Sequence, residues 1–190
     1  MTQEAQPALY FEDLAVGAVF ATPSVAVTAE EVRAFAARYD PQPFHLDEAA
    51  ARASVFGGMV ASGWMTAALT MRLMVQSEMR LGAGAVGLGI DALDWPRPVR
   101  PGDTLTARME IEAVRPSETR PEFGVVKLRT TTRNQHGRRV QVLVSNILVR
   151  RRPADGAAGR GNRGGAVAAA SGSGGAADTA NTPAAGGGGR

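Results

Sequence analysis

The chain of 190 residues contains no cysteine and only two histidines. The missing cysteines exclude a thiol nucleophile, a disulfide framework and any cysteine-ligated zinc or iron–sulfur site. Their absence fits a reducing compartment, and residues 1–12 lack the Lys or Arg and the apolar run of a secretory signal. We therefore expect a soluble cytoplasmic protein with few groups able to do acid–base chemistry near neutral pH.

Other common signatures are missing too. The net charge is only +3, and no stripe of basic and aromatic residues appears, so we expect no nucleic-acid binding. The basic triplet at 150–152 is typical of a solvated edge. No P-loop, no Rossmann glycine pattern and no clustering of histidines with carboxylates is present, so we expect no cofactor and no metal.

Charged residues are absent from Val55 to Met71. A membrane span needs about 20 strongly apolar residues, and this stretch is shorter and contains glycine, serine and threonine. It predicts a helix buried in a protein core, not in a membrane.

The composition changes sharply after Arg152. Residues 153–190 are mostly Gly and Ala, and they cannot bury enough apolar surface to offset the entropy of ordering them. We predict one folded domain over residues 1–152, followed by a disordered Gly/Ala-rich tail over 153–190 without a specific function.

The first half of the domain alternates strand and helix signals. A strand is predicted over 17–27, and a helix follows whose N-cap Thr28 and Glu31 form a capping box. That helix should end at Asp40, because Pro41 disfavours helical geometry in the preceding residue. A short helix is expected near 47–53, and a long apolar helix over 63–79 that Gly82 and Gly84 stop. The apolar spacing puts four residues on one face of the first helix: Val32, Phe35, Ala36 and Tyr39.

The second half predicts strands at 85–95, 104–114, 123–133 and 138–150, the last two joined by a hairpin turn at 134–137. Short connections favour an antiparallel meander of these four strands. We predict an α+β fold in which the sheet curls round the apolar helix. Alternate residues of the second of these strands should share one face: Leu105, Ala107, Met109, Ile111 and Ala113.

The segment Asp40-Pro41-Gln42-Pro43-Phe44-His45 places an acid and an imidazole close together on a stiffened backbone. Such a pair can activate a water and manage a proton, and the prolines restrict its backbone angles. The spacing alone favours a loop in which Asp40 bonds backbone amides and His45 packs at the surface.

The segment Gly57-Gly58-Met59-Val60-Ala61-Ser62-Gly63 leads into the long helix. Amides at a helix N-terminus favour negative charge, so Ser62-Gly63 can form an oxyanion site. Alternatively, the glycines only permit tight packing. His136 belongs to a hairpin turn and should face solvent, while Trp64 and Trp95 suit a core or an interface better than a cofactor platform.

Together these motifs, with Pro98-Val99-Arg100-Pro101-Gly102-Asp103, resemble the MaoC-like dehydratases, which include the R-specific 2-enoyl-CoA hydratases. The resemblance covers roughly residues 8–152. It implies a hot-dog fold, a curved antiparallel sheet around a central helix. It also implies a homodimer or larger homo-oligomer with the substrate channel at the subunit interface, and reversible addition of water to a trans-2-enoyl-CoA thioester.

Carried over by position, the resemblance makes Asp40 and His45 the catalytic pair, with the Gly63 amide holding the thioester oxygen. The expected substrate-binding residues around them are Gln42, Pro43, Phe44, Ser62 and Trp64. Two departures stand out, because the family often has Asn in place of Gln42 and His in place of Ser62. Both change the pocket rim and leave the substrate's identity open.

Two other functions remain open on the same fold, namely acyl-CoA thioester hydrolysis and non-catalytic acyl-thioester binding. The residues that hold the CoA phosphates are unassigned. Arg97 and Arg100 are candidates, although both fit better as exposed turn charges.

Overall fold

The computed structural model describes residues 8–153, in which five strands form one antiparallel sheet. The strands are β1 (Val19–Ala26), β2 (Ala85–Asp94), β3 (Thr104–Pro116), β4 (Phe123–Arg133) and β5 (Arg139–Arg150). The predicted Gly/Ala-rich tail lies outside the described residues, apart from Pro153.

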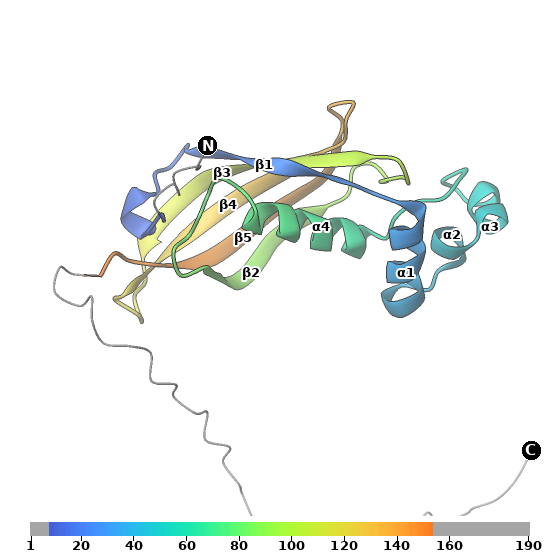
Figure 1. Ribbon diagram of the computed structural model, residues 1–190. Helices are drawn as coiled ribbons and strands as arrows, with labels where there is room; N and C mark the ends of the chain where they lie inside the picture. Colours follow the sequence, from blue (N-terminus) through green and yellow to red (C-terminus); the bar gives the residue numbers. More distant parts are fainter. Residues whose placement is uncertain (1–7, 154–190) are drawn as a thin grey trace, which may run out of the picture.

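Five helical segments accompany the sheet: η1 (Phe11–Asp13), α1 (Ala29–Tyr39), α2 (Pro43–Leu46), α3 (Glu48–Ala53) and α4 (Gly63–Val75). Figure 1 shows α4 lying along one face of the curved sheet, while α1, α2 and α3 gather beyond one end of it. This arrangement is the expected α+β hot-dog fold, with the long helix on the concave face of the sheet.

The strand order is β1-β3-β4-β5-β2, which corrects the predicted four-strand meander. Only β3, β4 and β5 follow one another, whereas β2 pairs with β5 at the far edge. The segment 95–103, which joins β2 to β3, is too rich in proline for a tight hairpin. It crosses the start of α4 instead, where Ala61 N–H donates to the Val99 carbonyl at 2.8 Å.

Helix α1 follows its local sequence signals. Thr28 caps it, Glu31 completes the capping box, and Asp40 is the C-cap. On the predicted apolar face Val32 and Ala36 are fully buried, but Tyr39 is exposed because it lies at the helix end beyond the core.

Helix α4 ends at Val75, four residues before the predicted end at Met79. Gln76 is its C-cap, and the Ser77 hydroxyl donates to the Met74 carbonyl at 2.6 Å. Serine competes for backbone groups in this way and favours helix ends. The sequence had suggested that Gly82 and Gly84 stop this helix, but α4 ends well before them.

The alternation of β3 changes near its end. Leu105, Ala107, Met109 and Ile111 are buried as predicted, but Ala113 is exposed and Val114 packs against the core instead. The pairing of β3 with β4 shifts register between Ile111 and Ala113. Such a bulge reverses which residues face the core.

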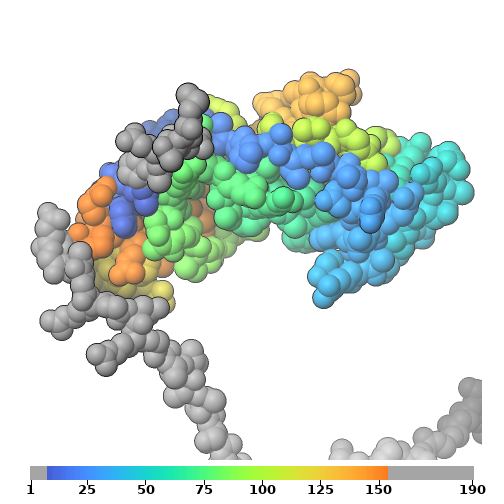
Figure 2. Space-filling model, viewed as in Figure 1, coloured from blue at the N-terminus to red at the C-terminus, as the bar shows by residue number. Residues whose placement is uncertain are grey.

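The sheet covers only one side of α4. Met65, Leu73 and Met74 are buried against it, whereas Trp64, Met71 and Val75 on the opposite side are exposed. Figure 2 shows this outer side of α4, in green, uncovered between β1 and β2. The sheet therefore curls round α4 as predicted, but within the described residues it leaves this outer side of the helix open.

The uncharged stretch from Val55 to Met71 is predicted to form a helix that does not cross a membrane. The described residues hold no helix with the length and apolar character that a membrane crossing needs. Residues 55–62 of the stretch form the loop before α4, and residues 63–71 form most of α4.

Candidate active site

Asp40 lies where α1 ends. Its backbone N–H closes the last turn by donating to the Ala36 carbonyl at 2.9 Å, and its backbone then leaves helical geometry before Pro41. The side chain is thereby released from the helix surface toward the segment that follows.

His45 lies on α2, a one-turn helix that the sequence reasoning had treated as a loop. Pro43 begins α2 at a position where proline's fixed φ and missing N–H do no harm. The Nδ1 of His45 lies 2.7 Å from the Val60 carbonyl oxygen. A carbonyl can only accept, so Nδ1 carries a proton and Nε2 is the nitrogen that faces Asp40.

The two side chains meet. His45 Nε2 lies 3.3 Å from Asp40 Oδ2, and the side chains are 5% and 19% exposed, respectively. The imidazole is fixed on its other edge by Val60 and packs edge-on against the Phe44 ring, with centroids 4.5 Å apart. The structure thus brings together the two groups that the sequence singled out, away from bulk solvent.

Polar neighbours keep the Asp40 carboxylate charged. The Ser62 hydroxyl is the main cause that lowers the pKa of Asp40, and burial acts in the opposite direction. Gln42 also lowers this pKa, and its Nε2 donates to Asp40 Oδ1 at 2.7 Å. The carboxylate is therefore ionised at neutral pH and can accept a proton.

Ser62 and Gly63 form the start of α4. The buried Ser62 is the N-cap and accepts from the Trp64 N–H at 3.2 Å. Gly63 is the first helical residue, so its N–H has no partner within the helix, and it donates to no other described residue. Side-chain space at Gly63 is closed by Trp95, whose ring would lie 2.8 Å from an added Cβ.

These residues line one cavity of about 410 Å³, within the usual size range of small-molecule sites. Six of its lining residues are the acid, the imidazole and four aromatic side chains: Asp40, His45, Phe44, Phe56, Trp64 and Trp95. Gln42, Ser62 and Gly63 also contribute to the wall, whereas Pro43 does not and instead shapes the backbone of α2.

The sequence profile of the MaoC like domain matches residues 13–134. The chain belongs to this family. The match covers β1 to β4 and therefore every residue of the cavity described above.

Two solved structures share the fold of this MaoC-like domain, and a third relative is similar to it in sequence. The crystal structure of a MaoC-like dehydratase from Rhodospirillum rubrum is 48% identical with a TM-score of 0.74, over 77% of this chain and 100% of that one. The (R)-hydratase from Aeromonas caviae, described as involved in PHA biosynthesis, is 32% identical with a TM-score of 0.58, over 74% and 99% of the two chains. The uncharacterized protein YdeM of Bacillus subtilis is 29% identical over 140 residues, 74% of this chain and 98% of YdeM.

Sequence reasoning missed several residues of the MaoC-like site. Val60 fixes the imidazole through its backbone carbonyl, which no side-chain pattern reveals. Phe56 and the segment 95–99 also line the cavity, and of these only Arg97 was named as a candidate, for the CoA phosphates. The one available signal was the Trp95-Pro96-Arg97-Pro98 break after a strand, which indicates a rigid crossing segment.

The second histidine takes no part in this site. His136 is exposed in the turn between β4 and β5, where its Nε2 lies 3.3 Å from Gln135 Nε2. Among residues 8–153, no group of three or more histidines, aspartates or glutamates is arranged to hold a metal ion.

Proposed function

We propose that the protein is a hydro-lyase that reversibly adds water across the double bond of a trans-2-enoyl-CoA thioester. The observation that carries this proposal is the 3.3 Å contact between His45 Nε2 and Asp40 Oδ2 in a cavity whose wall includes Gly63. Similarity to a MaoC-like dehydratase and to an (R)-hydratase supports the reaction class.

In the proposed reaction, one water molecule lies beside the pair, within reach of both the carboxylate and the imidazole. Its oxygen bonds to C3 of the substrate while the C2–C3 double bond becomes single. One proton of that water passes through the pair to C2, and the other remains on the new hydroxyl group. Asp40 and His45 return to their starting state, so dehydration follows the same path in reverse.

The negative charge that develops on the thioester oxygen needs a donor, and Gly63 N–H is our candidate. It is unused within the helix and sits at the positive end of the α4 dipole. Loss of one such donor costs about 3 kcal/mol of transition-state stabilisation, so this amide matters as much as the pair.

The first prediction tests the pair. Asp40→Asn and His45→Gln should each lower kcat for hydration of crotonyl-CoA by about 10²–10⁴-fold, since general acid–base groups contribute on this scale. The assay follows loss of the conjugated absorbance, and circular dichroism checks that both variants fold. His136→Gln is the matched control, because it removes the exposed histidine and should leave activity unchanged.

The same assay separates the alternatives. Release of free thiol from an acyl-CoA, detected with a thiol reagent, would identify a thioesterase, because hydration releases none. Calorimetric binding of an acyl-CoA without any reaction would identify a non-catalytic binding subunit. A folded protein that turns over no enoyl thioester would overturn the proposed function.

We also propose that the protein forms a homodimer. Strand β2 is an edge of the sheet, and its Val86, Leu88 and Ile90 are each more than half exposed. Exposed apolar side chains on an unpaired edge favour pairing with another chain. Trp64 on the uncovered side of α4 also lines the cavity, so a second copy on this side would close the site.

A further inference from the structure

The basic residues of the sheet divide into two sets. In the first set each cation is paired with a carboxylate: Arg108 with Glu110, Arg115 with Glu118, Lys127 with Asp91, and Arg129 with Glu112. A second set, in the sheet and its connecting segments, forms no ion pair with any of the described residues and includes Arg97, Arg133, Arg138, Arg139 and, at the opposite end of β5, Arg150.

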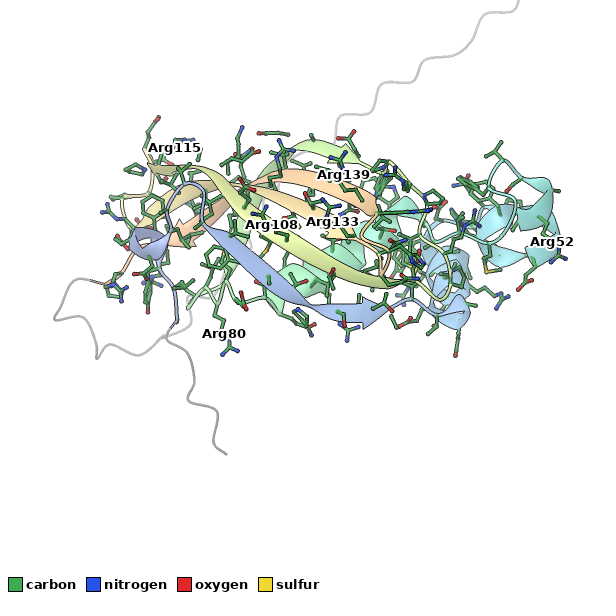
Figure 3. All side chains as sticks on the ribbon, turned by 90° about the horizontal axis from the view of Figure 1, so that it is seen from above. Arg52, Arg80, Arg108, Arg115, Arg133 and Arg139 are labelled. Atoms are coloured by element: carbon green, nitrogen blue, oxygen red, sulfur yellow. The ribbon has the colours of Figure 1, made fainter. Side chains whose placement is uncertain are left out.

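Three of these unpaired arginines, Arg97, Arg133 and Arg139, lie at the same end of the sheet, and we call them the arginine cluster. Arg133 and Arg139 are cross-strand partners at the hairpin ends of β4 and β5. Arg97 Nη1 donates to the Arg139 carbonyl at 3.4 Å. Figure 3 shows Arg133 and Arg139 close together on the outer face of the sheet, with Arg115 toward its opposite end.

Such a cluster costs stability on its own, because like charges directly opposite each other on a sheet repel. Arg133 Nη1 donates to the Gly137 carbonyl at 2.7 Å, which satisfies a hydrogen bond without neutralising any charge. Asp94 is exposed at the nearby end of β2 and forms no ion pair with these arginines. An anionic ligand would supply the missing counter-charge.

The arginine cluster adjoins the cavity, since Arg97 forms part of the cavity wall. The other charged or titratable groups of that wall are Asp40 and His45. Arg100, the second candidate from the sequence, does not line this cavity, and its Nη2 donates to the Phe56 carbonyl at 2.6 Å. The cavity therefore has the proton-transfer pair inside it and, in its wall, one guanidinium without a carboxylate partner among the described residues.

We propose that the arginine cluster binds the phosphate groups of coenzyme A while the thioester reaches Asp40 and His45. This inference rests on the proposed function and assigns a site to the nucleotide part of its substrate. Guanidinium groups bind phosphate oxygens through paired, charge-assisted hydrogen bonds. The cluster supplies three of them on adjoining segments, with no carboxylate partner to displace.

The test compares two substrates that carry the same acyl group, crotonyl-CoA and crotonyl-pantetheine, which lacks the phosphates. In Arg97→Gln and Arg139→Gln the ratio of kcat/KM for crotonyl-CoA to that for crotonyl-pantetheine should fall about tenfold. Arg115→Gln is the control, because it changes net charge equally at the other end of the sheet and should leave the ratio unchanged. Thermal unfolding checks that each variant is folded.

The outcomes separate this inference from the proposed function. An unchanged ratio in the cluster variants overturns the inference while hydration by the wild type stands. If the wild type hydrates neither substrate, the proposed function fails, and calorimetry with CoA then tests the cluster alone: weaker binding in the variants supports it, and equal binding overturns it. If the variants lose activity only on crotonyl-acyl carrier protein, the cluster binds a carrier protein and the CoA assignment is wrong.

Discussion

Asp40 is the residue whose charge state the proposed reaction depends on. The Ser62 hydroxyl and the Gln42 amide hold its pKa below the usual value, against the effect of burial. A carboxyl whose folded-state pKa is lowered stabilises the fold above its unfolded pKa, and that contribution is lost as pH falls through the folded pKa. The same lowered pKa keeps Asp40 ionised to a lower pH than an ordinary aspartate. Activity should therefore decline only at a pH below the usual pKa range of aspartate.

Replacing Ser62 by alanine tests this account. Without the hydroxyl the pKa of Asp40 rises, so the acid limb of kcat/KM for crotonyl-CoA should move to higher pH. The change also removes the N-cap of α4, which should lower the free energy of unfolding by about 1 kcal/mol. The pH profile and a denaturant titration measure the two effects separately.

Thr28→Ala provides the matched control. It removes an N-cap hydroxyl from α1 at a similar stability cost, but the Thr28 hydroxyl bonds only with Glu31 of its own capping box. Its acid limb should coincide with that of the wild type. An equal displacement in both variants would show that lost stability, not the pKa of Asp40, controls the profile.

At the scale of elements, the start of α4 and the segment after β2 hold each other in place. The Trp95 ring packs against Gly63, and Trp95 Nε1 donates to Oε1 of the fully buried Gln141 at 2.9 Å. The proposed oxyanion donor is therefore positioned by β2 and β5 as well as by its own helix. Disturbing this contact should disturb the chemistry without removing any titratable group.

Gly63→Ala makes that disturbance. The new Cβ would lie 2.8 Å from the Trp95 ring, so the ring or the helix start must move. Because alanine is intrinsically the better helix former, a loss is steric in origin. We expect kcat on crotonyl-CoA to fall about 10²-fold, the scale of a lost oxyanion donor.

Two further variants test whether the loss of kcat in Gly63→Ala has a steric cause. Adding Trp95→Leu to Gly63→Ala frees space beside the new methyl group and should restore part of kcat. Gly58→Ala places its Cβ 3.3 Å from the movable end of Arg100 and should stay near wild-type activity. A Gly63→Ala enzyme with full activity would remove this glycine from the proposed mechanism.

Most individual elements could be predicted because their signals are local. The capping box at Thr28, the proline after Asp40 and the hairpin at 134–137 each act within a few residues. The position of β2 beside β5 and the bulge that exposes Ala113 depend on contacts between distant strands. Single-chain patterns carry no information about such pairing.

The residues of the candidate site also fall into two groups, those with a local sequence signal and those placed by contacts between distant segments. Asp40 and His45 are five positions apart, and the glycine before an apolar run is visible in the sequence, so these three could be found. Trp95 reaches the cavity through the crossing of segment 95–103 over the start of α4, and the Val60 carbonyl reaches the imidazole from the loop before α4. Their roles follow from tertiary packing, not from residue type.

At the scale of the whole molecule, one side is left apolar. Strand β2 forms an edge of the sheet, and α4 turns Trp64, Met71 and Val75 outward next to it. By contrast, two ion pairs join the residues that follow β5 to η1: Arg151 pairs with Glu12, and Arg152 pairs with Asp13. The basic triplet at 150–152 thus lies at a solvated edge, as predicted. The apolar side is the surface that a second copy would cover.

Ile90→Lys tests that assembly. A charged residue on an edge strand opposes pairing with another strand, so the variant should run as a monomer in sedimentation analysis where the wild type runs as a dimer. Its kcat/KM on crotonyl-CoA should fall, because the cavity then stays open beside Trp64. Val55→Lys is the control, since Val55 is 97% exposed in the loop after α3 and should leave the dimer intact. A wild-type protein that sediments as an active monomer would refute the proposed dimer and show that one chain completes the site.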